Sequence, residues 1–176
     1  AVRIVALALD IAIAGGVCET AEEAAAAYRA RPLAIGLANV APLLMAFGAP
    51  YGSIEGRGLA GAVTALASAS AWAVSAEMAD MLGACPGFAD RPDHPQRVLR
   101  NLRRAVLGQA TGYEGANVPA QRLYPLNTVQ ADLIDRARAA LTCAIDGAAR
   151  TGLRNLSVTA LSQDGTAAAL LAADTA

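Results

Sequence analysis

The residues best suited to chemistry lie near the end of the chain, in the loop Ser162-Gln-Asp-Gly165-Thr166. The loop follows an alternating segment, Leu156 to Leu161, that predicts a strand, and it precedes an alanine-rich run that predicts a helix. A strand, a glycine-containing loop and a helix N-terminus can form an anion site, because exposed backbone N–H groups and the Thr166 hydroxyl donate to phosphate oxygens. Residues 162–166 are therefore a candidate phosphate-binding loop.

Asp164 supports a second interpretation of the same loop. A carboxylate about 4 Å from a phosphate charge costs about 4 kcal/mol per unit charge at an effective dielectric of 20. Without a metal ion between the two charges, the loop would bind phosphate weakly, and Asp164 would instead cap the following helix. From the residues alone, the helix cap is favoured over the ligand site.

Two further patterns are weaker candidates for binding. Gly56-Arg-Gly58-Leu-Ala-Gly61 matches the glycine spacing of dinucleotide-binding turns, but a Pro50-Tyr-Gly turn precedes it where that motif requires a strand. We interpret it as the first turn of a helix that tolerates glycine. An arginine stripe could bind phosphate or RNA, but a solvated helix face is favoured; it consists of Arg97, Arg100, Arg103 and Arg104.

Thiols and imidazole offer little for metal binding or catalysis. Cys18, Cys85 and Cys143 lie far apart with no C-x-x-C pair, and the single histidine, His94, cannot form a usual zinc site. The cysteines are therefore predicted to be reduced and mostly buried.

The elements that must position these residues are mainly helices. Apolar residues at helical spacing predict helices over 1–16, 20–29, 39–47, 54–82, 97–106 and 128–150, and a last helix after residue 166. Short apolar or alternating segments predict strands at 33–36 and 156–161, while 84–95 and 108–127 are predicted loops. No repeat or linker divides residues 1–176, so the sequence predicts a single domain, mainly α with a few short strands.

Composition excludes several classes of protein. The chain has 176 residues, of which 55% are hydrophobic and only 4% aromatic, so it is neither disordered nor a small disulfide scaffold. A net charge of −1 indicates no nucleic-acid partner.

The segments Pro32–Ile54 and Gly58–Ala76 are uncharged, but their prolines, alanines and serines disfavour membrane insertion. Asp10 interrupts the N-terminal segment that could resemble a signal peptide. We expect a cytoplasmic protein.

A series of sequence blocks carries a family resemblance: Arg31-Pro-Leu-Ala-Ile-Gly36-Leu-Ala-Asn39, Leu43-Leu-Met45, Pro50-Tyr51-x-Ser53-x-Glu55-Gly56-Arg57, Ala62-Val-Thr-Ala-Leu66, Ser75-Ala-Glu-Met78, Gly112-Tyr-Glu-Gly115 with Val118-Pro119, and Gly152-Leu-Arg-Asn155 with Val158-Thr159. Their types and order resemble the catalytic chain of class II, adenosylcobalamin-dependent ribonucleotide reductases over nearly the whole chain.

The resemblance implies a segment from the C-terminal half of a ten-stranded α/β barrel that reduces ribonucleotides by a thiyl-radical mechanism. The family's radical and redox cysteines lie outside the matched region. Its substrate-phosphate loop, A-P-T-G-T-I, corresponds to residues 162–167, where Gly165 and Thr166 match while Gln163 and Asp164 replace proline and threonine. The resemblance thus assigns substrate-phosphate binding to Ser162, Gln163, Asp164, Gly165 and Thr166.

These observations lead to two functional hypotheses. In the first, the chain is a reductase-like segment that is non-catalytic alone, with a structural, interaction or weak nucleotide-phosphate-binding role. In the second, it is one part of a split or truncated reductase that supplies DNA precursors together with another chain. We expect self-association or a partner chain, with a ribonucleotide as candidate ligand. Adenosylcobalamin is implied only by the resemblance.

Overall fold

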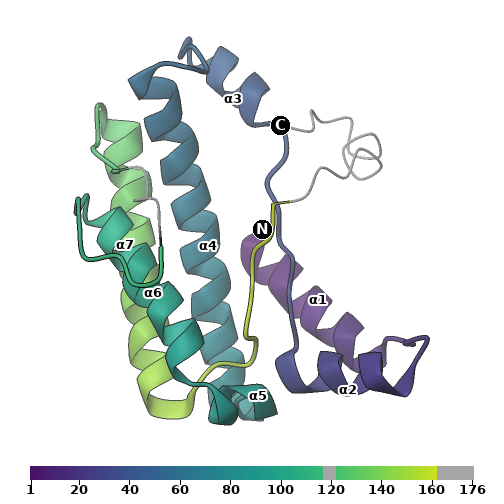
Figure 1. Ribbon diagram of the computed structural model, residues 1–176. Helices are drawn as coiled ribbons and strands as arrows, with labels where there is room; N and C mark the ends of the chain where they lie inside the picture. The colour runs from purple at the N-terminus through teal and green to yellow at the C-terminus, as the bar shows by residue number, and fades with distance from the viewer. Residues whose placement is uncertain (117–121, 162–176) are drawn as a thin grey trace.

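Two long helices, α4 (Ile54–Leu82) and α7 (Thr128–Thr151), lie side by side at the centre of the computed structural model (Figure 1). The structure describes residues 1–116 and 122–161. The two helices run in the same direction, since Gln130 contacts the Glu55 carbonyl near both N-termini and Gly147 meets Ala76 further along. Their buried faces consist largely of alanine, glycine and serine, which lets the helices approach closely, as the sequence predicts.

In the part of the chain that the structure describes, five shorter helices surround this pair. α6 (Asp93–Val106) packs against α7, and α1 (Val2–Gly15) packs against α4. α3 (Val40–Ala46) contacts α4 at the end where α4 begins (Figure 1). α2 (Ala21–Ala30) and α5 (Pro86–Asp90) contact each other near the end of α4.

Local sequence signals explain most of the helix boundaries. Thr20 and Glu23 form the predicted capping box at the start of α2, and the Ser53 hydroxyl accepts a hydrogen bond from the Gly56 N–H at the start of α4. Gly83 and Gly152 end the two long helices with φ of 82° and 84°, a backbone region that glycine enters without strain. The predicted limits of these helices are confirmed within a few residues.

The predicted loop over residues 84–95 is wrong in part. α5 occupies Pro86–Asp90, and α6 begins at Asp93 rather than near Arg97. Pro86 stands at the first position of α5 and Pro95 in the first turn of α6, where a proline removes no helical hydrogen bond. The prolines therefore start helices here, whereas the sequence analysis interpreted them as loop residues.

The strands expected at 33–36 and 156–161 are also corrected. Within residues 1–116 and 122–161 the structure contains no regular strand, only an isolated parallel bridge between Ile35 and Thr159. The described part of the chain is therefore helical, and the few short strands of the predicted fold class are not confirmed.

α4 is the one described helix long and apolar enough to cross a membrane. In its most apolar stretch, however, 61% of the residues are buried inside the protein. Trp72, Val74 and Met78 of this helix belong to the hydrophobic core together with residues of α1, α6 and α7. The core helix of a soluble protein gives the same signal.

Candidate functional site

The predicted phosphate-binding residues, Ser162, Gln163, Asp164, Gly165 and Thr166, lie outside the described residues. The described chain leads directly to them. After α7 it extends beside residues 31–36 as far as Leu161, and backbone hydrogen bonds join the two extended segments (Figure 1). Their pairing therefore determines where the chain enters the predicted loop.

This pairing changes register by one residue. Ile35 N donates to Val158 O at 3.1 Å, and Ile35 O accepts from Ala160 N at 3.3 Å, as a parallel bridge requires. Two residues earlier, Leu33 N donates to Ser157 O at 2.9 Å. In the register of Ile35, Leu33 N would instead donate to the carbonyl of the residue before Ser157. The acceptor advances by one residue while the donor advances by two, so a regular parallel ladder does not form.

A buried polar cluster lies where the two extended segments begin, and its side chains come from Asp10, Arg31, Ser75 and Asn155. Arg31 donates from Nε to Asp10 Oδ1 at 2.8 Å and from Nη2 to the Asp10 carbonyl at 2.7 Å. Asn155 Nδ2 donates to Asp10 Oδ1 at 3.0 Å and to the Arg31 carbonyl at 2.9 Å. The Asn155 N–H donates to Ser75 Oγ at 2.9 Å. The cluster thus joins α1, the end of α2, the C-terminal half of α4 and the segment after α7.

Arg31 also makes the turn between α2 and the first extended segment. Its φ of 43° lies in the left-handed region, which costs a non-glycine residue roughly 1–3 kcal/mol. Its N–H donates to the Ala27 carbonyl and closes α2, and Pro32 follows at once. The hydrogen bonds to Asp10 hold this strained backbone in place.

Asp10 is charged although only 5% of its surface is exposed. Burial alone would raise its pKa, but hydrogen bonds from Arg31 and Asn155, together with the positive charges of Arg31 and Arg154, lower the pKa below 3.8. Arg154 Nε lies 3.7 Å from Asp10 Oδ2. The buried carboxylate is therefore held between two guanidinium groups.

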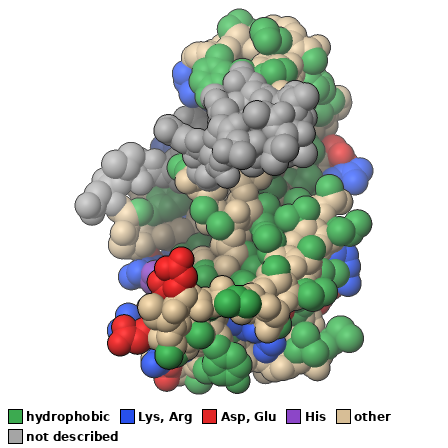
Figure 2. Space-filling model, turned by 90° about the vertical axis from the view of Figure 1, so that its right-hand side faces the viewer, with side chains coloured by type: hydrophobic (Ala, Val, Ile, Leu, Met, Phe, Trp, Pro, Cys, Tyr) green, Lys and Arg blue, Asp and Glu red, His purple; other side chains and the backbone are tan. Residues whose placement is uncertain are grey.

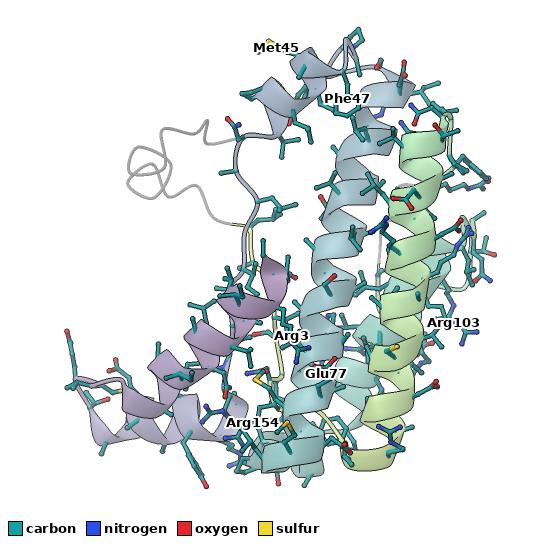
Figure 3. All side chains as sticks on the ribbon, turned by 180° about the vertical axis from the view of Figure 1, so that it is seen from behind. Arg3, Met45, Phe47, Glu77, Arg103 and Arg154 are labelled. Carbon is teal, nitrogen blue, oxygen red and sulfur yellow. The ribbon has the colours of Figure 1, made fainter. Side chains whose placement is uncertain are left out.

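Arg154 connects the cluster to the end of α4, since its Nη1 donates to the Gly83 carbonyl at 3.2 Å. Within the described segments, Arg154 Nε and Asn155 Oδ1 are buried without a hydrogen-bond partner. An exposed ion pair between Arg3 and Glu77 adds a second link from α1 to α4 (Figure 3).

Two of the four arginines in the stripe on α6 form ion pairs with an acidic residue. Arg100 donates to both carboxylate oxygens of Glu114, and Arg104 Nη1 donates to Glu114 Oε1 at 2.9 Å. Hydrogen bonds from Arg100 and then Arg104 lower the pKa of Glu114 to about 2. Arg103 points away from the helix core toward solvent (Figure 3). Arg100 and Arg104 thus hold residues 112–115 against α6 through Glu114. This role of the stripe is not predicted by the sequence.

The three cysteines differ from the prediction of mostly buried thiols. Cys85 is buried, and burial raises its pKa, but Cys18 and Cys143 are exposed. Cys18 lies between α1 and α2, and Cys143 lies on the outer face of α7, so neither side chain is buried by neighbouring elements. His94 is also exposed and contacts Arg97, and the described residues gather no group of three potential metal ligands.

The glycine pattern at residues 56–61 has a packing role in α4. A Cβ on Gly56 would lie 2.3 Å from the Pro50 carbonyl oxygen, and one on Gly61 would lie 2.7 Å from Leu123 Cδ2. Gly58 lies against the Gln130 side chain. Gly56 lies in the first turn of α4, which confirms the interpretation of the pattern as a helix turn, and its close approach to Pro50 leaves no room for a side chain.

The buried cluster is not predicted by the sequence, in which Asp10 stands out only as a charge that interrupts an apolar segment. Because a carboxylate is almost never buried without a partner, a charge within the apolar pattern of a helix predicts a buried cation elsewhere. Which of the 14 arginines supplies it could not be predicted, since Arg31 lies 21 residues away and Arg154 far beyond it.

A family model for the ribonucleotide reductase barrel domain matches residues 1–175. The chain belongs to this family. It is 38% identical to a vitamin B12-dependent ribonucleotide reductase of Agrobacterium fabrum over 175 residues, covering 99% of this chain and 14% of that protein. It is 40% identical to one of Bradyrhizobium diazoefficiens over 148 residues, covering 84% and 12% respectively.

These comparisons confirm the resemblance noted in the sequence. The chain spans about a seventh of the Agrobacterium reductase and less of the Bradyrhizobium one, so it is a reductase-like segment rather than the counterpart of a whole relative. The relatives' dependence on vitamin B12 agrees with the cofactor that the resemblance implies.

The cavity between α6 and α7 does not fit a cobalamin. It is shallow, and its volume of about 190 Å³ is smaller than the roughly 300–1,000 Å³ of typical small-molecule sites. Leu99, Ile145 and Ala148 make it mostly apolar, and Gln96 and Arg100 also line it.

Proposed function

We propose that this chain is a structural segment of the barrel domain of an adenosylcobalamin-dependent ribonucleotide reductase. It contributes to ribonucleotide reduction, and so to DNA precursor synthesis in the cytoplasm, only together with the rest of that domain. The observation that carries the proposal is the large apolar surface on α1 and α3.

On α1, Ile4 and Ile11 are seven residues apart and so lie on one face, where they are 72% and 71% exposed, and Val5 beside Ile4 is 43% exposed. Around α3, Met45 and Phe47 are exposed in the same way (Figure 3). In the view that shows this side of the molecule, hydrophobic side chains are spread widely, while charged ones gather toward the lower left, the bottom and the right edge (Figure 2). Apolar surfaces of this kind mark contacts with other protein surfaces.

The chemical contribution of the segment would come from residues 162–166. By the family resemblance, the backbone around Gly165 and the Thr166 hydroxyl would donate to a ribonucleotide phosphate. The extended segments that end at Leu161 support this assignment, because they anchor the chain directly before the loop.

A stand-alone, non-catalytic protein is the second candidate. Gln163 and Asp164 favour it, because they depart from the family's loop and the Asp164 carboxylate repels phosphate. In this case the same apolar faces would be covered by a second copy of the chain, and nucleotide binding would be weak.

A chimeric reductase distinguishes the two candidates. The chain would replace the matching 175 residues of the Agrobacterium relative, and adenosylcobalamin-dependent reduction of ribonucleotides would be measured. We expect the chimera to be active and the isolated chain to be inactive. A chimera that folds and binds cobalamin but does not turn over would contradict the proposal and favour the stand-alone protein.

A thermal-shift titration of the isolated chain tests the loop separately. Ribonucleoside di- and triphosphates that bind the folded state must raise its melting temperature. We expect a saturable rise that Thr166→Ala reduces. No rise at millimolar nucleotide would mean that the loop does not bind phosphate by itself.

A further inference from the structure

The arginine stripe on α6 carries more positive charge than the acidic residues beside it neutralise. Two carboxylates, those of Asp93 and Glu114, form ion pairs with the stripe. Within residues 1–116 and 122–161, no ion pair includes Arg97 or Arg103. A partly exposed cluster with such an excess of positive charge attracts anions.

Glu114 occupies the centre of this cluster. Its carboxylate accepts hydrogen bonds from Arg100 Nε at 3.0 Å, from Arg100 Nη2 at 2.6 Å and from Arg104 Nη1 at 2.9 Å. A guanidinium that holds a carboxylate through two nitrogens has the geometry that also fits a phosphate. Because the hydrogen bonds lower the pKa of Glu114 to about 2, the carboxylate is charged at neutral pH. Glu114 is thus an internal anion among donors that suit phosphate.

Two glycines bring the backbone of residues 112–115 close to the arginines. Gly112 and Gly115 have φ of 87° and 64°, in the left-handed region that glycine enters without strain. A Cβ on Gly112 would lie 3.4 Å from Arg104 Nε, and one on Gly115 would lie 3.3 Å from Arg97 Nη1. Arg97 is therefore the third arginine beside Glu114.

The contact between Glu114 and α6 lies at the surface and can open without disturbing the core. The exposed fractions of the side chains are 39% for Arg100, 26% for Arg104 and 35% for Glu114. Asn101 holds the Glu114 backbone, since its Oδ1 accepts from the N–H and its Nδ2 donates to the carbonyl, each at 2.9 Å. Asp93 also accepts from Arg100 Nη2 at 3.0 Å, but it is 76% exposed and can turn to water. A small anion in solution can therefore reach the two guanidinium groups.

We propose that Arg97, Arg100 and Arg104 form a binding site for a phosphate group, and that Glu114 occupies this site as an internal competitor. A phosphate that enters must displace the Glu114 carboxylate, so the site opens when residues 112–115 move away from α6. The site consists of residues of α6 and of residues 112–115, so its existence does not depend on the proposed function.

Glu114→Gln tests the site, because it removes the competing charge and keeps the shape of the side chain. Asp132→Asn is the matched control, since Asp132 also pairs with an arginine, Arg136, but on the surface of α7. Melting temperatures are measured in sodium phosphate and in sodium chloride of equal ionic strength. We expect phosphate to raise the melting temperature of Glu114→Gln by about 3–6 °C at ten times its dissociation constant. The wild type and Asp132→Asn should not show this rise.

The comparison of variants separates this site from any other phosphate site on the chain. Phosphate bound elsewhere would raise the melting temperature of the wild type and of Glu114→Gln alike. Adding Arg104→Ala to Glu114→Gln should abolish the additional rise. A rise that is equal in all variants, that survives Arg104→Ala, or that is absent from a folded Glu114→Gln protein would overturn the inference.

A parallel titration of Glu114→Gln with adenosine triphosphate distinguishes a free phosphate from the phosphate of a nucleotide. A lower half-saturation concentration than that of inorganic phosphate identifies a nucleotide as the ligand, because the base and ribose then add contacts. An equal or higher concentration identifies free phosphate. Either result, if Arg104→Ala abolishes it, supports a phosphate site on α6.

Hydrogen exchange of the wild type keeps the proposal testable if Glu114→Gln does not fold. The Glu114 N–H is held by Asn101 Oδ1, so its exchange reports the opening of residues 112–115. We expect phosphate to speed this exchange relative to chloride of equal ionic strength. The Gln130 N–H, which Asn127 caps at the start of α7, should exchange at the same rate in both salts. Exchange of the Glu114 N–H that is equally slow in phosphate and in chloride would contradict the proposal.

Discussion

At the scale of single residues, Asp10 brings a negative charge into the interior, where its partners come from distant parts of the chain. Arg31 lies 21 residues away and Asn155 lies 145 residues away. Removing one member of such a set leaves the others buried and uncompensated, which costs more than the intact set contributes. The cluster should therefore be sensitive to the loss of any one charge.

Asp10→Asn should lower the free energy of unfolding by about 3–5 kcal/mol, because it leaves the buried Arg31 guanidinium without its counter-ion. Urea denaturation of the purified chain measures the change. Asp132→Asn is the control, since Asp132 pairs with Arg136 on the exposed surface of α7 and its loss should cost under about 1 kcal/mol. Similar losses in the two variants would show that Asp10 is not effectively buried.

Asp10 should also contribute to the pH dependence of stability. Its pKa in the folded protein lies below the ordinary value of 3.8, so its contribution is complete above about pH 3.8 and is lost as the pH falls through the folded-state pKa. Glu114, with a pKa of about 2, loses its contribution in an overlapping range. Unfolding free energies of the wild type and Asp10→Asn should therefore converge on acidification, and a constant difference between them down to pH 2 would contradict the assignment.

At the scale of elements, the parallel helices α4 and α7 can pack closely because small side chains lie between them. A Cβ on Gly147 would lie 2.7 Å from Ala76 Cβ, closer than packed atoms come. Glycine is otherwise unfavourable inside a helix by up to about 1 kcal/mol relative to alanine. Its presence at this position is explained by helix packing.

Gly147→Val should therefore destabilise the protein by about 1–3 kcal/mol, because the added volume forces α4 and α7 apart. Thermal unfolding followed by circular dichroism measures the change. Gly15→Val is the matched control, because a Cβ there meets no atom within 4 Å. A Gly147→Val protein as stable as Gly15→Val would mean that the helices do not pack this closely.

At the scale of the whole molecule, apolar surface remains on the side of α1 and α3 while the opposite faces of these helices are packed. Ile4 and Ile11 lie on the outer face of α1, and Ala6 lies on its inner face with no exposed surface. Both faces of α1 are thus apolar, which is typical of a helix between two protein layers. An isolated chain should associate through this outer face.

The double variant Ile4→Glu and Ile11→Glu should shift the isolated chain from an associated to a monomeric state, because charges make burial of the face unfavourable. Light scattering at micromolar concentration measures the mass. The matched control places the same two charges on exposed positions of α7, as Ala139→Glu and Ala149→Glu. A wild-type chain that is already monomeric would contradict the expectation.

The sequence by itself determined most of the described helices of this protein, though not α5 or the start of α6, and it determined the family. Caps, glycine stops and apolar periodicity act over a few residues, so Ser53, Gly83 and the repeat within α4 predict the same helix that the structure contains. The sequence blocks that resemble the reductase family are likewise local patterns. The candidate phosphate loop at 162–166 is predicted in the same way, from residue types next to one another, and it lies outside the described residues.

Only the tertiary structure decided the contacts between distant segments. The partners of Asp10, the parallel course of α4 and α7, and the register change between Leu33 and Ile35 depend on which residues meet after folding. Segments 33–36 and 156–161 each have strand character, yet the cluster at Arg31 and Asn155 and the bridge at Ile35 hold them in two different registers. A strand requires a regular partner, and no local pattern specifies one.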